Sequence, residues 1–152
     1  MGQRALRGTA LVVASGLAAI GVLHAVWSVT PWPLADRESF ARVVVGVPVE
    51  QSPSPGLALM VAGLLVAAGY LVASGGLPAL RIGPRWVLVA GRYVVAGVLL
   101  LRGAGGVVLD LAGSPAAPAD FVRFDLMLYS PLCLALGTGA SVVARRGRRL
   151  AP

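Results

Sequence analysis

The chain has 152 residues, of which 57% are hydrophobic and 12% charged, and its mean hydropathy is +0.84. A soluble domain carries about a quarter charged residues, so the composition excludes a soluble enzyme, a secreted disulfide-bonded domain and a disordered tail. All 13 basic residues are arginine and the net charge is +7. In a chain this apolar, that charge indicates contact with lipid headgroups, and we expect no nucleic-acid partner.

The first apolar run covers residues 10–29 and follows Arg4 and Arg7. Its charge pattern resembles a signal peptide, but the run is about twice as long as a typical h-region, and no small-residue cleavage site follows His24. We interpret it as a retained first span. Residues 30–55 then form a long loop rich in proline and charge, whose apolar middle, 40–49, is expected to cover the bundle as a lid or to lie at the membrane interface.

Three further spans are expected at residues 56–73, 86–108 and 118–144, each about the length that a bilayer requires. Within the fourth, Pro131 leaves the carbonyl group of Met127 without its helical donor and predicts a kink. The predicted fold is therefore all-α: a four-helix transmembrane bundle, in a single domain over residues 1–152, with a long first extracytoplasmic loop.

Charge placement predicts the orientation of this bundle. One side has no carboxylate, while the other has three arginines and all six acidic residues. By the positive-inside rule the arginine-rich side is cytoplasmic. We expect a multi-pass protein of the bacterial cytoplasmic membrane with both termini in the cytoplasm. The arginines of the cytoplasmic side are Arg4, Arg7, Arg81, Arg85, Arg145, Arg146, Arg148 and Arg149.

Ionisable residues inside the spans are the main functional signal, because their burial in a bilayer is costly. His24, Arg102 and Asp125 come from three different spans and, at 1.5 Å per residue, lie at similar depths towards the outer side. Tyr129 shares a face with Asp125. We expect Arg102 to pair with a carboxylate, and His24 to lie within reach of that pair. The expected carboxylates are Asp125 first, then Asp110 or Glu50.

Two functional interpretations of these residues stay open. In the first, the protein handles a small lipid- or isoprenoid-like ligand in an outer-leaflet polar pocket, by acid–base isomerisation or cyclisation if it is an enzyme. In the second, it is a non-catalytic accessory or scaffold subunit, in which the same side chains staple helices together or snorkel to the interface. The first interpretation assigns catalytic roles to His24, Asp125 and Tyr129, and ligand-binding roles to Arg102, Trp27, Arg92 and Glu50.

Cofactor chemistry has little support in the sequence. The single cysteine, Cys133, excludes an intramolecular disulfide and a CxxC pair. One histidine cannot supply both axial ligands of a haem, and one cysteine with one histidine cannot build a structural zinc site. We expect no cofactor and no metal. The expected partners are the lipid bilayer and a small hydrophobic ligand, with a homo-oligomer or a larger membrane complex left open.

Several segments carry a resemblance to a known family. They include Leu23–Trp27 with Trp32-Pro33, Asp36–Glu38 with Ala41–Gly46, Arg92 with Gly97 and Leu101–Gly103, and, most specifically, Phe121 with Asp125–Leu134. In these segments the chain resembles the uncharacterised "domain of unknown function 3995" family of small bacterial membrane proteins. The resemblance covers nearly the whole chain. It implies a four-helix architecture and supplies no activity.

Overall fold

The computed structural model describes residues 2–113 and 117–149, which are mainly helical and contain no strand. Four long helical stretches are each long and apolar enough to cross a membrane, which confirms the predicted all-α, four-helix fold. They are α1 (Gln3–Trp27), α3 (Pro55–Gly76), α4 (Arg85–Leu111) and a fourth stretch made of α5 (Ala119–Phe124), the π-helical turn η4 (Asp125–Tyr129) and α6 (Ser130–Arg149).

The helices extend beyond the apolar runs from which they were predicted. α1 begins at Gln3 instead of residue 10, because Arg4 and Arg7 are good helix formers that continue the helix past its apolar part. α3 begins at Pro55, where the Ser54 hydroxyl accepts a hydrogen bond of 3.4 Å from the backbone N–H of Leu57. Proline suits this first helical position because it has no N–H to leave unpaired.

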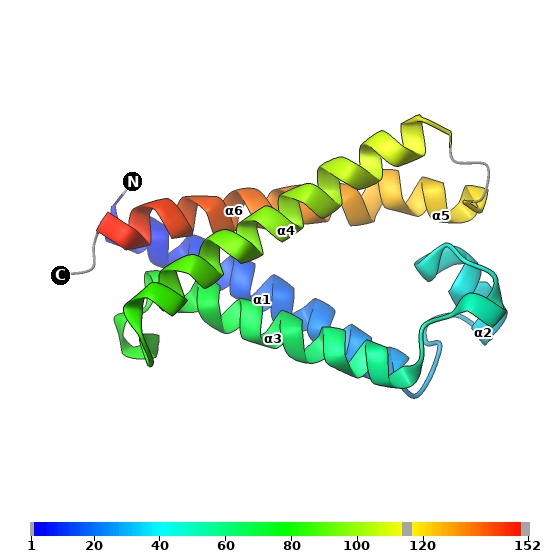
Figure 1. Ribbon diagram of the computed structural model, residues 1–152, viewed down its shortest axis with the longest axis horizontal. Helices are drawn as coiled ribbons and strands as arrows, with labels where there is room; N and C mark the ends of the chain where they lie inside the picture. Colours follow the sequence, from blue (N-terminus) through cyan, green and yellow to red (C-terminus); the bar gives the residue numbers. More distant parts are fainter. Residues whose placement is uncertain (1, 114–116, 150–152) are drawn as a thin grey trace.

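Two antiparallel helix pairs make up the bundle: α1 packs along α3, and α4 packs along α6. Glycines allow the close approach of the first pair, since a Cβ atom at Gly21 or Gly69 would lie 3.2 Å from a backbone oxygen of the neighbouring helix. The pairs lie together at the terminal end, which holds the start of α1 and the end of α6. They separate towards the loop end, which holds α2 (Arg37–Phe40) and α5 (Figure 1).

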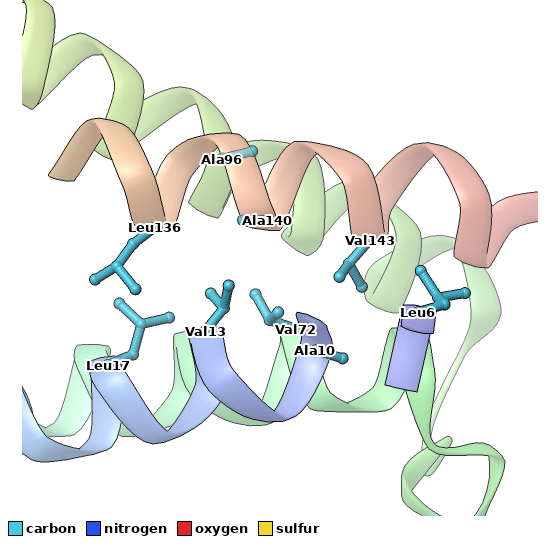
Figure 2. Packing of buried hydrophobic residues seen from close by; sticks show 9 residues of the cluster. All are labelled: Leu6, Ala10, Val13, Leu17, Val72, Ala96, Leu136, Ala140 and Val143. Atoms are coloured by element: carbon cyan, nitrogen blue, oxygen red, sulfur yellow. The ribbon is translucent and has the colours of Figure 1, made fainter. Parts of the chain in front are cut away.

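A buried apolar cluster joins the two pairs towards the terminal end, where side chains of α1 face those of α6 (Figure 2). Many large apolar side chains elsewhere, such as Leu64, Val98 and Leu101, are exposed, as expected for helices surrounded by lipid. The loop end is therefore held together by other contacts. The cluster consists of Leu6, Ala10, Val13, Leu17, Val72, Ala96, Leu136, Ala140 and Val143.

The segment between α1 and α3 contacts both helix pairs at the loop end. It contains α2, the π-helical turn η1 (Ala41–Val45) and the 3-10 turn η2 (Val49–Gln51). The ring of Phe40 packs edge-on against Trp27 of α1, with centroids 5.4 Å apart. Gly46 has a φ of +82° and lies so close to Phe121 of α5 that a Cβ atom would come within 2.7 Å of its ring. The apolar segment 40–49 thus bridges the ends of the two pairs.

Between α3 and α4 the chain makes a short 3-10 turn, η3 (Pro78–Leu80).

Candidate functional site

Asp125 is the most deeply buried acidic residue of the candidate site, with a side chain only 1% exposed. It opens the π-helical turn η4, in which the backbone N–H of Ser130 donates to the carbonyl oxygen of Asp125, five residues earlier. Pro131 follows directly and has no N–H to offer, so a regular α-helix is already interrupted here. Such π turns inside helices are frequent at functional sites. The predicted disturbance at Pro131 therefore takes the form of a widened turn at Asp125.

Arg102 of α4 forms an ion pair with Asp125, as predicted. Its Nη2 donates to Asp125 Oδ1 at 2.5 Å, and its Nη1 lies 3.5 Å from both Asp125 Oδ2 and Ser130 Oγ. The hydroxyl of Ser130 donates to Asp125 Oδ2 at 2.6 Å. Hydrogen bonds to a charged group are stronger than those between neutral groups, so this buried carboxylate has partners on both oxygens.

Ser130 was not among the predicted site residues. In a regular α-helix, a residue five positions on lies about 140° around the axis from the first, so Ser130 would face away from Asp125. The π-helical turn reduces that angle and brings the two side chains together. The signal in the sequence was Pro131, which marks the place where the regular helical spacing is disturbed.

Glycines on α4 make room for this polar cluster. A Cβ atom at Gly106 would collide with Arg102 Nη1, Asp125 Oδ2 and Ser130 Oγ, the three groups that converge there. One turn earlier, a Cβ atom at Gly103 would lie 2.9 Å from the backbone oxygen of Ser130. The Arg102–Asp125 pair thus lies over a strip of helix without side chains.

A second carboxyl group, that of Asp110, belongs to the same cluster. Arg102, Gly106 and Asp110 are spaced four residues apart and therefore share one face of α4. Asp110 interacts with Asp125, and its Oδ2 is buried without a hydrogen-bond partner among the described residues. One guanidinium balances only one of two carboxylates. The cluster is neutral only when a carboxyl group carries a proton, so its composition suits proton exchange.

His24 lies on the other helix pair, near the loop end of α1. Its Nδ1 is 2.9 Å from the carbonyl oxygen of Ile20, and its ring centroid is 4.9 Å from that of Trp27. Because a carbonyl oxygen only accepts, Nδ1 carries the proton, and Nε2 is the nitrogen able to accept one. Among the described residues, no hydrogen bond, ion pair or ring contact joins His24 to the Arg102–Asp125 pair.

Tyr129, Trp27 and Glu50 lie around the loop end. The ring of Tyr129 packs near Phe121 and Phe124, with centroids 6.3 and 6.4 Å away. Trp27 donates from Nε1 to the backbone oxygen of Trp32 at 2.9 Å.

Two cavities occur in the bridging segment at this end. Trp27 lines one of about 260 Å³, together with Phe40 and Arg37. Glu50 lines another of about 300 Å³, together with Glu38 and Arg42. Neither cavity includes Arg102 or Asp125 in its lining.

Arg92 lies apart from the other predicted ligand-binding residues, near the terminal end. The residue is 3% exposed, and its surroundings include Gly75 of α3 and Gly147 of α6. Ten residues separate it from Arg102, which is about 15 Å along the axis of α4. The predicted site residues therefore fall into three groups: the Arg102–Asp125 cluster, the loop end around Trp27, and Arg92.

The comparisons with known proteins identify a family without an assigned activity. No curated protein and no solved structure matches the chain. The sequence profile of one family, described as "Protein of unknown function (DUF3995)", matches residues 17–140. That range contains α3 and α4 entirely, the segment that bridges the helix pairs, and both halves of the Arg102–Asp125 cluster. The predicted resemblance is therefore confirmed, and the chain belongs to the DUF3995 family of proteins of unknown function.

Proposed function

We propose that this protein binds a small lipid- or isoprenoid-like molecule at the loop end of its bundle, with Arg102 as the group that holds the polar head. The observation that carries the proposal is the unequal burial of the ion pair. Asp125 is 1% exposed, whereas Arg102 is 44% exposed although it lies inside a candidate membrane span. A guanidinium has five donors, and the contacts with Asp125 and Ser130 engage only Nη1 and Nη2.

The chemistry of Arg102 favours a ligand with an anionic or carbonyl head. A donor exposed in an apolar environment is costly unless an acceptor satisfies it, and a guanidinium matches a carboxylate or a phosphate in two parallel hydrogen bonds. The exposed apolar side chains of α4 beside it, including Leu101 and Val98, suit a hydrocarbon tail. Both features match a lipid-like molecule better than a water-soluble metabolite.

Acid–base conversion of that ligand is the catalytic form of the proposal. Asp125 and Asp110 supply carboxyl groups beside Arg102 that can take up and return a proton, as an isomerisation or a cyclisation requires. The hydroxyl of Tyr129 would donate a hydrogen bond. For His24 Nε2 to act as the second proton carrier, the ligand has to extend from the α4–α6 pair to the α1–α3 pair, which a long, flexible molecule can do.

We further propose that the protein lies in the bacterial cytoplasmic membrane with both termini in the cytoplasm. Four apolar helices and the placement of eight arginines without a carboxylate on the terminal side support this orientation. A reporter that is active only in the periplasm, fused after Pro152, is expected to be inactive. The same reporter inserted next to Gln51 is expected to be active, and the reverse pattern would contradict the orientation.

A scaffold function is the second candidate, and the full pairing of the buried Asp125 carboxylate favours it. Asp125 has partners on both oxygens, and these partners join α4 to the fourth stretch. Such a network fixes the position of two helices against each other without any ligand. In that case the protein is a non-catalytic subunit of a larger membrane assembly.

Photo-crosslinking with a diazirine-bearing fatty acid distinguishes the two functions, because this probe combines a carboxylate head with an apolar tail. We expect the wild-type protein in detergent micelles to be labelled near Arg102. The variant Arg102→Met/Asp125→Leu removes both charges together, so it avoids an unpaired buried charge. If the ligand-binding function is correct, this variant keeps its helical circular dichroism spectrum but loses labelling at least tenfold.

The matched control is Arg4→Met, which removes one arginine from an exposed position of α1 at the terminal end. Its labelling is expected to stay within twofold of wild type. Equal labelling of all three proteins would contradict ligand binding at Arg102 and leave the scaffold function as the better explanation of the network.

A further inference from the structure

The terminal end of the bundle contains a buried arginine in a slot formed by two glycines. Arg92 of α4 is 3% exposed. A Cβ atom at Gly75 of α3 would lie 3.2 Å from Arg92 Cδ, and one at Gly147 of α6 would lie 3.1 Å from Arg92 Nη1. Contacts that short are tighter than most side chains tolerate. The slot therefore exists because neither helix carries a side chain at these positions.

Among the residues that the structure describes, Arg92 forms no ion pair with an acidic side chain. Its Nε is buried and has no hydrogen-bond partner among the described residues. All six acidic residues of the chain belong to the loop end. Three lie in the bridging segment, one lies at the end of α4, and two lie in α5 and η4. A buried charge without a counter-ion is costly, so its presence requires an explanation. The six are Asp36, Glu38, Glu50, Asp110, Asp120 and Asp125.

A second arginine lies next to this slot. Arg81 follows the turn η3 and contacts Ser74, the residue directly before Gly75 of the slot. Its Nε donates to the backbone oxygen of Ser74, in the last turn of α3, at 3.3 Å. The Ser74 carbonyl group, at the C-terminal end of α3, stabilises the charge of Arg81, but by less than a full counter-ion would. Arg81 is only half-buried, so this guanidinium is reachable from outside the bundle.

We propose that Arg92 and Arg81 together bind a phosphate group at the terminal end, a site separate from the proposed ligand site at Arg102. Two guanidiniums at one place match the geometry and charge of phosphate oxygens, which accept several parallel hydrogen bonds. The phosphate supplies a negative charge that no described side chain supplies at this end. An anionic lipid headgroup and a free phosphate ion share this chemistry.

Isothermal titration calorimetry on the full-length, delipidated protein in dodecylmaltoside tests the site. The probes are sodium phosphate at constant ionic strength, phosphatidylglycerol in mixed micelles, and diacylglycerol as the lipid without phosphate. We expect saturable binding of at least one phosphate-bearing probe and none of diacylglycerol. Binding of phosphatidylglycerol alone identifies a lipid headgroup, and equal binding of sodium phosphate identifies a soluble anion. No saturable binding of either phosphate-bearing probe would overturn the proposal.

Variants separate a built site from general attraction by a basic surface. Arg92→Met is expected to weaken binding at least tenfold, whereas Arg4→Met, which removes the same charge from an exposed position at the same end, is expected to stay within twofold. Equal losses in the two variants would overturn the proposal.

Two further variants decide the matter if Arg92→Met does not fold. Gly147→Ala keeps every charge but narrows the slot, because its Cβ atom would lie 2.9 Å from the Gly75 backbone oxygen and 3.1 Å from Arg92 Nη1. Arg81→Met removes the half-buried partner. Each is expected to weaken binding at least threefold. If both variants fold and both bind within twofold of wild type, the proposal is wrong.

Discussion

Arg102 and Arg92 lie ten residues apart on the same helix, but they differ in burial and in the partners of their guanidinium groups. Arg102 is 44% exposed and faces a buried carboxylate, whereas Arg92 is 3% exposed and its Nε has no partner among the described residues. In both places glycine makes room for the guanidinium: Gly106 at the loop end, and Gly75 with Gly147 at the terminal end. The comparison teaches that the role of an arginine in a candidate membrane span depends on the groups that face it from the neighbouring helices.

The two ends of the bundle also differ in the kind of contact that holds the helices together. At the terminal end, the helix pairs are joined by apolar packing around Leu17, Val72 and Val143 (Figure 2). At the loop end, the bridging segment and the polar cluster of α4 and the fourth stretch hold the chain together. Polar networks are strong only when every member is satisfied. The loop end is therefore the more sensitive of the two to single substitutions.

Arg102→Met is expected to have the largest effect on stability. It leaves Asp125, at 1% exposure, without its counter-ion. Breaking a buried ion pair in this way costs about 3–5 kcal/mol, and the half-exposed position of Arg102 places the loss towards the lower value. The free energy of unfolding, from titration with sodium dodecyl sulfate in dodecylmaltoside micelles, measures it.

The double variant Arg102→Met/Asp125→Leu provides the control for that prediction. It removes both charges, so the unfolding free energy is expected to recover by more than half of the loss. A double variant as unstable as Arg102→Met alone would show that the cost comes from packing and not from an unpaired charge.

Gly106→Ala is expected to have the next largest effect, because its Cβ atom would collide with Arg102, Asp125 and Ser130 at once. Overpacking of this kind costs about 1–3 kcal/mol. Gly105→Ala is the matched control, since a Cβ atom at Gly105 meets no atom within 4 Å. It is expected to stabilise the helix by about 0.5–1 kcal/mol, because alanine is the better helix former. Similar effects of the two substitutions in the same micelle assay would contradict the role assigned to Gly106.

Much of this site was predictable from the sequence, and the remainder depended on local geometry. The Arg102–Asp125 pair followed from the cost of charge in a membrane and from equal depth along alternating helices. Ser130 was missed because regular helical spacing turns it away from Asp125, and only the π-helical turn η4 brings it back. His24 was predicted to lie near the pair because of its depth along its helix, but depth says nothing about which helices are neighbours. α1 packs mainly on α3, not beside the face of α4 that carries Arg102.

Arg92→Met sharpens the comparison of the two arginines, because its expected effect on stability differs from that of Arg102→Met. A buried cation without a carboxylate gains little from its surroundings, so its replacement by an apolar side chain of similar length is expected to change stability by less than about 1 kcal/mol. The measurement is the same micelle titration on delipidated protein. A loss as large as that of Arg102→Met would show that carbonyl groups at the end of α3 compensate Arg92 fully.

The smallest expected effect concerns the loop end and depends on pH. Asp36 caps α2: its Oδ1 accepts from the backbone N–H of Ser39 at 2.7 Å, and its Oδ2 from the Ser39 hydroxyl at 3.1 Å. These hydrogen bonds, that from the backbone N–H first, lower the pKa of Asp36 below its ordinary value of 3.8. A carboxyl group with a lowered pKa in the folded state stabilises above its unfolded pKa of about 3.9, and this contribution is lost as the pH falls through the lowered value. We expect the amide resonance of Ser39 to shift only below about pH 4. In Asp36→Asn, which keeps the capping oxygen but does not titrate, the shift should disappear, and a shift that persists in this variant would assign the titration to another group.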